Sequence, residues 1–240
     1  MRIAVIDSGV HPRHDHIDAA RLEPGVAVLA DGTVVEGPEA TLDRLGHGTA
    51  VMAAIQEKAP GAICLPVRVF GDALRSSAAA LLAAIRWTID QKAAIINLSL
   101  GTPNPAHRVP MAEVVEEARQ AGVVIVAARE NGGIPVYPGA LPHVIGVGLD
   151  WDCPRHCYRC EQQDGVLAFL APGYPRPIPG VPQRRNLHGI SFATAQIAGF
   201  AALACEQRGA DRRPGPASVA EVAEQLTAQA FAQSRSGAPA

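Results

Sequence analysis

Apolar positions along the chain form short continuous runs that alternate with longer stretches of helical spacing. The runs Arg2–Asp7, Ala62–Phe70 and Ala94–Leu100 are typical of strands that are buried on both faces. Between them, Gly48–Lys58 and Ser76–Lys92 have the apolar spacing of helices. The first hundred residues therefore predict a β-α-β-α-β series and an α/β fold with a mainly parallel sheet.

The same alternation continues through the rest of the chain. It predicts a helix at 110–121, strands at Val123–Ala128, His143–Gly148 and Val166–Leu170, and helices at Phe192–Gln207 and 218–233. Neither an internal repeat nor a linker divides these elements. We therefore expect a single domain over residues 1–233, followed by a disordered tail at 234–240.

Composition excludes some classes of binding partner and indicates the cellular compartment. Lys and Arg total 21 against 23 Asp and Glu, so the formal charge is −2 and gives no support to a nucleic-acid or anionic-membrane surface. We find no apolar run long enough to span a bilayer and no leader resembling a signal peptide. The five cysteines are odd in number, which is untypical of a secreted disulfide framework. These features predict a cytoplasmic protein that binds neither nucleic acid nor membrane.

Three segments place a reactive side chain among small residues. They are Asp7-Ser8-Gly9, Gly46-His47-Gly48-Thr49 and Gly189-Ile190-Ser191-Phe192-Ala193. Together they supply an acid, a base and a hydroxyl in the order Asp, His, Ser, whereas α/β-hydrolases run Ser, Asp, His. The last segment also lacks the final glycine of a nucleophile elbow. Both differences exclude an α/β-hydrolase.

These segments resemble the motifs of the subtilase family of serine proteases. Asp7-Ser8-Gly9 is similar to the family's D-[ST]-G, and His47-Gly48-Thr49-Ala50-Val51 to H-G-T-H-V. The serine motif G-T-S-M-A-T-P reads Gly189-Ile-Ser191-Phe-Ala-Thr-Ala195, preceded by Ala171-Pro172-Gly173. The resemblance runs from Ile3 to about residue 208 and implies a three-layer fold with helices on both faces of the sheet.

The resemblance also implies roles for individual residues. Ser191 is the expected nucleophile, His47 the base that takes its proton, and Asp7 the acid that orients His47. Ser99, Leu100 and Gly101 resemble the strand that pairs with the substrate backbone. Aligned without gaps, the strand ending at Ala128 places Asn131 as the oxyanion donor.

The segment before Asn131 departs from the family pattern. Arg129 and Glu130 replace small residues that form a wall of the pocket for the residue before the scissile bond. A register shift of one residue would instead turn Glu130 toward the oxyanion and oppose catalysis. With Asn131 in the donor position, Glu130 predicts a preference for Arg or Lys before the cut.

A cysteine cluster is the second departure from the family. Cys153, Cys157 and Cys160 have the spacing C-x3-C-x2-C, and a fourth ligand such as His143 or His156 would complete tetrahedral zinc. The alternatives are a cluster of free thiols or an internal disulfide. A structural zinc ion is thus a hypothesis here, and no cofactor is expected for catalysis itself.

A histidine-rich loop follows Asp7. His11, His14 and His16, with Asp15 and Asp18, form a cluster of a kind that binds metals. The family, however, often carries an H-P-D-L-like turn at this point, which His14-Asp15-His16-Ile17 resembles. We therefore favour the structural interpretation.

The favoured function is a serine endopeptidase that hydrolyses peptide bonds through an acyl-enzyme on Ser191. Because no leader or pro-segment is evident, we expect a dedicated protease that matures a precursor or leader peptide. One rival is a non-catalytic peptide-binding pseudoprotease whose cleft is blocked by Arg129-Glu130 or the cysteine insertion. The other is a transpeptidase or macrocyclase that passes the same acyl-enzyme to an amine. The expected partner is a peptide or protein substrate, and a further partner protein is left open.

Overall fold

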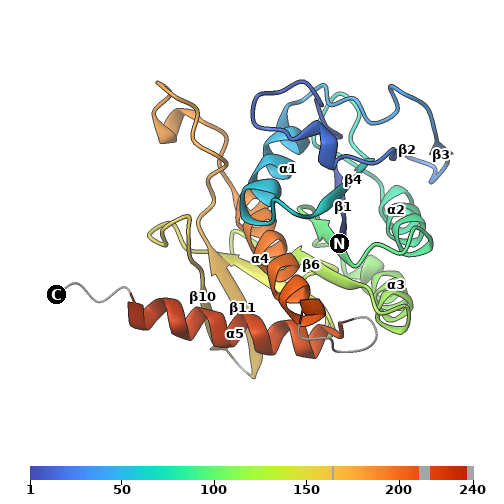
Figure 1. The fold of residues 1–240 in the computed structure, drawn as a ribbon. Coiled ribbons are helices and arrows are strands. Elements are labelled where there is room, and N and C mark those ends of the chain that lie inside the picture. The colour runs from blue at the N-terminus through green and yellow to red at the C-terminus, as the bar shows by residue number, and fades with distance from the viewer. Residues whose placement is uncertain (164, 211–216, 237–240) are drawn as a thin grey trace.

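The computed structural model describes residues 1–163, 165–210 and 217–236 and is built around one nine-stranded sheet (Figure 1). The strand order is β10-β11-β9-β6-β5-β1-β4-β2-β3. These strands are β1 (Arg2–Asp7), β2 (Val26–Val28), β3 (Val34–Val35), β4 (Ile63–Arg68), β5 (Ile95–Leu98), β6 (Val124–Ala128), β9 (Ile145–Leu149), β10 (Arg159–Gln163) and β11 (Val166–Ala171). A separate hairpin consists of β7 (Glu130–Asn131) and β8 (Ile134–Pro135).

The inner strands of the sheet run parallel, and only the outermost pairs, β10 with β11 and β3 with β2, are antiparallel. In the register of the centre, Ile3 of β1 lies opposite Ile95 of β5 and Cys64 of β4. Parallel strands covered on both faces are expected to be continuous apolar runs, as these are. The predicted α/β class with a mainly parallel sheet is confirmed.

Helices cover both faces of the sheet, as Figure 1 shows. The α-helices are α1 (His47–Lys58), α2 (Ala78–Asp90), α3 (Arg108–Gln120), α4 (Ile190–Ala210) and α5 (Val219–Ser236), and short 3-10 helices span Ala19–Arg21, Pro105–His107 and Gln183–Arg185. Alternate residues of β1 divide the core. Ile3 and Val5 pack with α1, α4 and α5, whereas Ala4 and Ile6 pack with α2 and α3. This two-residue period produces the three layers.

Helix α4 is the central helix of its layer. It contacts α1, α5 and the strands β5, β6, β9 and β11. Most of its buried residues are alanine or another apolar residue, and Ala193, Ile197 and Ala201 are fully buried. A helix that is apolar on every side is expected to lie inside the fold rather than on its surface.

The structure differs from the predicted elements mainly at short edges and at the C-terminus. Sequence patterns missed β2, β3, β7, β8 and β10, which are edge or hairpin strands with little apolar periodicity. Helix α5 extends to Ser236 and so includes the first residues of the expected tail, whose disorder stays a prediction. Residues 237–240 of that tail lie outside the described residues. The assignment of one domain to 1–233 stays a prediction.

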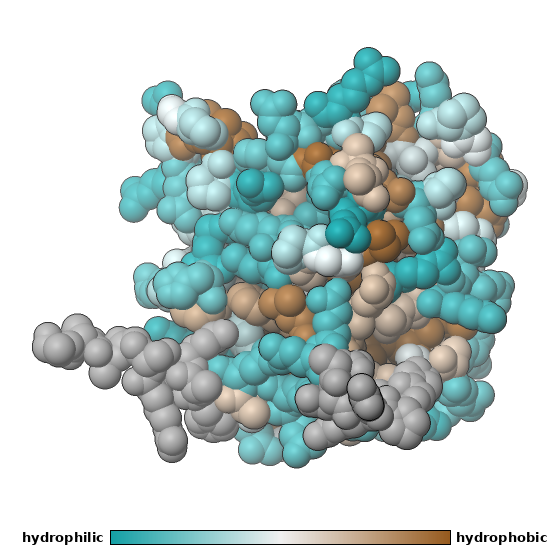
Figure 2. Space-filling model, in the orientation of Figure 1, coloured by the Kyte–Doolittle hydropathy of each residue, from teal (hydrophilic) through white to brown (hydrophobic). Residues whose placement is uncertain are grey.

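The surface is mainly polar on the face drawn in Figure 2, with apolar residues scattered across it. Among the described helices, none is long and apolar enough to cross a membrane.

Candidate active site

The predicted catalytic side chains come from three elements that meet at one edge of the sheet. Asp7 is the last residue of β1, His47 is the first residue of α1, and Ser191 lies in the first turn of α4. Strand carboxyl ends and helix amino ends of an α/β fold face the same edge, which is where ligands bind in such sheets. The topology therefore brings together residues that are 184 positions apart in the sequence.

Asp7 and His47 form a buried pair. Nδ1 of His47 lies 2.7 Å from Oδ1 of Asp7, which is fully buried. The same oxygen accepts a hydrogen bond from the backbone N–H of Ser8 at 2.8 Å. Among the described side chains, Oδ2 of Asp7 is a buried oxygen without a hydrogen-bond partner. Because a carboxylate oxygen accepts hydrogen bonds, Nδ1–H of His47 is the donor in the contact with Oδ1.

The environment of His47 changes its basicity. Burial by itself lowers the pKa of this imidazole, but the hydrogen bond and negative charge of Asp7, together with the charge of Asp43, outweigh burial and raise the pKa above 6.5. Because Nδ1 contacts Asp7, Nε2 is the ring nitrogen left to accept a proton. His47 is therefore oriented as a proton acceptor.

Glycine allows the start of α1 to approach the end of β1. A Cβ atom at Gly48 would lie 2.3 Å from the carbonyl oxygen of Gly9, which is far too close. Gly46, at φ +76°, takes the left-handed conformation that leads into α1. The glycines on both sides of His47 are thus needed to bring its ring to Asp7.

Sequence reasoning missed Asp43, a buried carboxylate that holds the loop in front of His47. Its Oδ1 accepts hydrogen bonds from Ser8 Oγ and from the backbone N–H groups of Leu45 and Gly46, each at 2.9 Å. Its Oδ2 accepts from the N–H of Thr49 at 2.8 Å and from its hydroxyl at 2.6 Å. An acidic residue just before a helix start was the available signal, because such residues cap orphan N–H groups.

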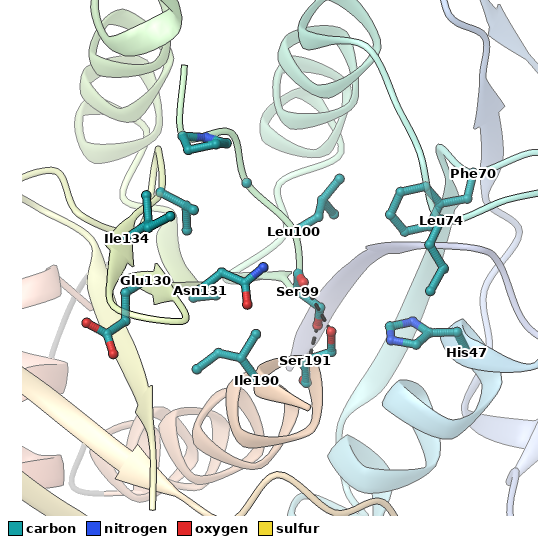
Figure 3. A pocket seen from close by; sticks show the side chains of 14 residues that line it. His47, Phe70, Leu74, Ser99, Leu100, Glu130, Asn131, Ile134, Ile190 and Ser191 are labelled. Atoms are coloured by element: carbon teal, nitrogen blue, oxygen red, sulfur yellow. Dashed lines mark hydrogen bonds between the residues drawn. The ribbon is translucent and has the colours of Figure 1, made fainter. Parts of the chain in front are cut away.

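Ser191 is tied to Ser99, just beyond β5. Oγ of Ser191 donates to the backbone carbonyl oxygen of Ser99 at 3.2 Å, and Oγ of Ser99 donates to the carbonyl oxygen of Ser191 at 3.3 Å (Figure 3). A hydroxyl has one hydrogen to donate, so in this conformation it does not donate to His47. The side chain must rotate before His47 accepts its proton, and catalytic hydrogen bonds are often unmade without substrate.

One cavity of about 290 Å³ contains most of the predicted site residues. His47 and Ser191 line it together with Ser99, Leu100, Gly101, Glu130 and Asn131. Sequence reasoning missed the apolar part of this wall, which includes Phe70, Leu74, Ile134, Val136 and Ile190. A concave, largely apolar cavity with a few polar groups is the usual form of a ligand site.

Asn131 and Glu130 point in different directions. Figure 3 shows the Asn131 amide directed toward Ser99 and Ser191, whereas the Glu130 carboxylate points away from them. Both residues belong to the short hairpin strand β7. This arrangement favours the gap-free alignment over the register shift, because the amide rather than the carboxylate faces Ser191.

The segment from Ser99 to Gly101 is not a strand in the structure. The predicted strand 94–100 ends at Leu98 in β5. Thr102 and Tyr137 then exchange two backbone hydrogen bonds of 2.9 Å. A Cβ atom at Gly101 would lie 2.8 Å from the carbonyl oxygen of Tyr137, so this segment is packed against the residues after β8. Its role toward a substrate backbone stays a prediction.

The cysteine cluster presents two neighbouring thiols. The sulfur atoms of Cys153 and Cys157 are 3.9 Å apart, and Cys160 lies on β10. Within the described ranges, no group of three or more His, Cys, Asp or Glu side chains is arranged to hold a metal ion, including in the histidine-rich loop. The pair alone does not fit a tetrahedral zinc site, and the zinc hypothesis stays a prediction.

The Asp7–His47 pair, the serine at a helix start and the parallel three-layer fold are the features of the subtilisin-like class of proteins. The chain belongs to the subtilase family, whose model matches residues 1–236. M-protease of Shouchella clausii (strain KSM-K16) is 29% identical over 216 residues, which cover 85% of this chain and 53% of M-protease. Subtilisin BL of Lederbergia lenta is 29% identical, over 85% of this chain and 75% of its own length.

A solved structure supports the same fold. A cold-adapted subtilisin-like serine proteinase aligns with a TM-score of 0.69 and 20% sequence identity, over 95% of this chain and 81% of the other. The chain thus spans most of that structure, but only about half the length of M-protease.

Proposed function

We propose that this chain is a serine endopeptidase that cleaves peptide bonds through an acyl-enzyme on Ser191. The observation that carries the proposal is the buried Asp7–His47 pair, whose imidazole opens into the same cavity as Ser191. A serine hydroxyl is a weak nucleophile at neutral pH and needs a positioned base. His47 is that base, and Asp7 stabilises the imidazolium that forms when the proton is transferred.

The chain's own groups account for each step. Ser191 Oγ attacks the peptide carbonyl carbon as His47 takes the hydroxyl proton, and His47 then gives that proton to the leaving amine. Asn131, which lies on the other side of Ser191 from His47, donates a hydrogen bond to the oxyanion together with the N–H groups at the start of α4. A water molecule then repeats the sequence on the acyl-enzyme and releases the acid.

The proposal is tested by intact-mass analysis after incubation with a fluorophosphonate. Wild-type protein is expected to gain a single adduct on Ser191, with loss of fluoride, and Ser191→Ala is expected to gain none. The reagent reports on nucleophile activation without knowledge of the substrate. Folded wild-type protein that gains no adduct would contradict the proposal.

The absence of an adduct would favour the pseudoprotease alternative. One observation supports that alternative, namely that the Ser191 hydroxyl is directed to the Ser99 carbonyl oxygen instead of to His47. A peptide that binds Ser191→Ala and wild type equally and is never cut by wild type would then be the positive evidence for a binding module.

Within the endopeptidase proposal, we favour limited processing of precursor or leader peptides over general degradation. Support comes from the pocket wall, where Glu130 and Ile134 project from the β7–β8 hairpin. A charged, structured wall favours selection among side chains, and Glu130 specifically favours Arg or Lys before the cut. A cytoplasmic location is part of this proposal, supported by the odd number of cysteines, five, which is untypical of a secreted disulfide framework.

Matched peptide libraries test this selectivity. We expect wild type to cut few library members, with Arg preferred over Leu before the scissile bond, and Glu130→Ala to lose that preference. Indiscriminate cleavage would contradict the processing role. An Arg preference that survives in Glu130→Ala would contradict the role of this carboxylate.

A further inference from the structure

A second cavity, of about 260 Å³, lies beside the start of α1. Three segments form it: the histidine-rich loop after β1, the residues around Gly46, and the loop that leads into α4. Arg44 and Arg176 both line it, as do His11, His14 and His16. Neither the motifs nor the proposed catalytic steps assign a role to this cavity.

Positive charge is concentrated in this cavity. Arg44 is exposed, and Arg176 is partly buried with its guanidinium donating to the carbonyl oxygen of His16 at 3.1 Å. Burial, followed by the charges of Arg176 and His14, lowers the pKa of His16, against the opposing effects of Asp15 and Glu57. The guanidinium groups of Arg44 and Arg176 are permanently charged and supply positive charge to this cavity.

A carboxylate, Asp43, also lines the cavity but has no acceptor to spare. Its two oxygens accept five hydrogen bonds, from Ser8, Leu45, Gly46 and Thr49. It therefore does not neutralise Arg44 or Arg176 by direct pairing. The remaining wall includes Ile178 and Leu187, which are exposed apolar side chains.

The second cavity is lined by residues that lie close in sequence to both His47 and Ser191. Gly46 lines it and precedes His47, while Leu187 lines it and stands four residues before Ser191. In Figure 3, Asn131 and Glu130 lie on one side of Ser191, and His47 lies on the other. Because His47 protonates the leaving amine, the leaving segment must pass next to His47. The second cavity is a candidate for the residues that follow, because its walls include sequence neighbours of His47 and Ser191.

We propose that the second cavity is the subsite for the leaving segment of the substrate and that it binds a glutamate side chain one or two residues after the cut. This inference rests on the proposed endopeptidase function. The carboxylate would accept hydrogen bonds from the guanidinium groups of Arg44 and Arg176. The methylene groups of the glutamate would contact Ile178 and Leu187.

The test uses pairs of quenched peptides that differ only by Glu or Gln at each of these two positions. We expect wild type to cleave the better Glu peptide with about tenfold higher kcat/KM, since a charge-assisted contact of this kind is worth roughly one power of ten. The preference should weaken as salt is added. The Arg44→Gln/Arg176→Gln variant should cleave Glu and Gln peptides equally.

Two controls make the outcome specific. Arg108→Gln removes an exposed arginine at the start of α3 that does not line this cavity, and it should keep the full preference. Arg44→Gln alone should retain part of the Glu preference. This single variant keeps the hydrogen bond from Arg176 to His16, so it remains informative if Arg176→Gln disturbs folding. Equal cleavage of both peptides by wild type, or a preference that survives in the double variant, would overturn the proposal.

A binding measurement separates this proposal from the catalytic one. Fluorescence anisotropy with labelled peptides and Ser191→Ala should show the same Glu preference without any cleavage. A preference in binding without a fluorophosphonate adduct on wild type would retain the subsite and reject the endopeptidase. An adduct on wild type without any Glu preference in binding would reject the subsite alone.

Discussion

The pair of Asp7 and His47 controls the pH dependence of the proposed reaction. His47 acts as a base only when neutral, so activity must fall as pH drops through its pKa. Since Asp7 and Asp43 raise that pKa, we expect the acid limb of kcat/KM to have its midpoint above the ordinary histidine value of about 6.5.

Asp7→Asn should move that midpoint to lower pH and reduce kcat by about 10⁴-fold, because the amide presents the wrong partner to Nδ1. Asp15→Asn is the control: it removes an exposed carboxylate that does not act on His47, and the midpoint should stay where it is in wild type. A midpoint that stays in place in Asp7→Asn would mean that another group sets the acid limb.

Replacing Asn131, the proposed oxyanion donor, tests a second catalytic role. Asn131→Ala should reduce kcat by about 10²–10³-fold with a small change in KM, because the amide is needed where charge develops in the transition state. Glu130→Gln is the matched control from the same hairpin, and its kcat should change far less. If Glu130→Gln instead raised kcat and Asn131→Ala had no effect, the alignment would be off by one residue.

The starts of α1 and α4 are the elements that present the base and the nucleophile. Gly48 allows the first turn of α1 to lie against the turn after β1, where a Cβ atom would meet a backbone oxygen at 2.3 Å. Gly48→Ala should therefore destabilise the fold by about 1–3 kcal/mol and reduce activity by shifting His47.

Thermal unfolding and kcat/KM measured on the same samples check this expectation. Gly71→Ala is the control, because a Cβ atom there meets nothing within 4 Å. Equal behaviour of the two alanine variants would show that the close approach at Gly48 does not constrain α1.

Long elements were predictable and short ones were not. The runs that became β1, β5 and β6 are continuous and apolar, and the helices have clear spacing, so periodicity located them to within a few residues. The hairpin β7–β8 has two residues per strand and no period to detect. The C-terminal boundary was also hard to predict, since α5 extends to Ser236, beyond the expected end of the helix at 233.

The packing of α1 on α4 sets the spacing between His47 and Ser191. The two helices are in close contact at Gly199, where a Cβ atom would lie 2.5 Å from Cβ of Lys58 and 3.2 Å from the carbonyl oxygen of Ile55. Alanine normally gains about 1 kcal/mol over glycine inside a helix. Here we expect the clash to dominate, so that Gly199→Ala loses about 1–3 kcal/mol of stability.

The same substitution should lower kcat, because moving the helices apart also separates base and nucleophile. Urea unfolding with a parallel activity assay measures both effects. At Gly61, where a Cβ atom meets only the flexible end of Glu206 at 3.4 Å, Gly61→Ala should be neutral in both measurements. A stabilised and fully active Gly199→Ala would show that the helices can adjust without cost.

The sequence alone determined the α/β class and the family resemblance, and it predicted Asp7, His47, Ser191 and Asn131 as site residues, because periodicity and local motifs are encoded in neighbouring residues. It did not reveal the hydrogen bonds of Asp43, the direction of the Glu130 carboxylate or the cavity lined by Arg44 and Arg176. These features join segments that are far apart in the chain, and the cavity alone is lined by residues from His11 to Leu187. Only the tertiary structure decides them, because side-chain contacts and charges depend on which segments the sheet and helices bring together.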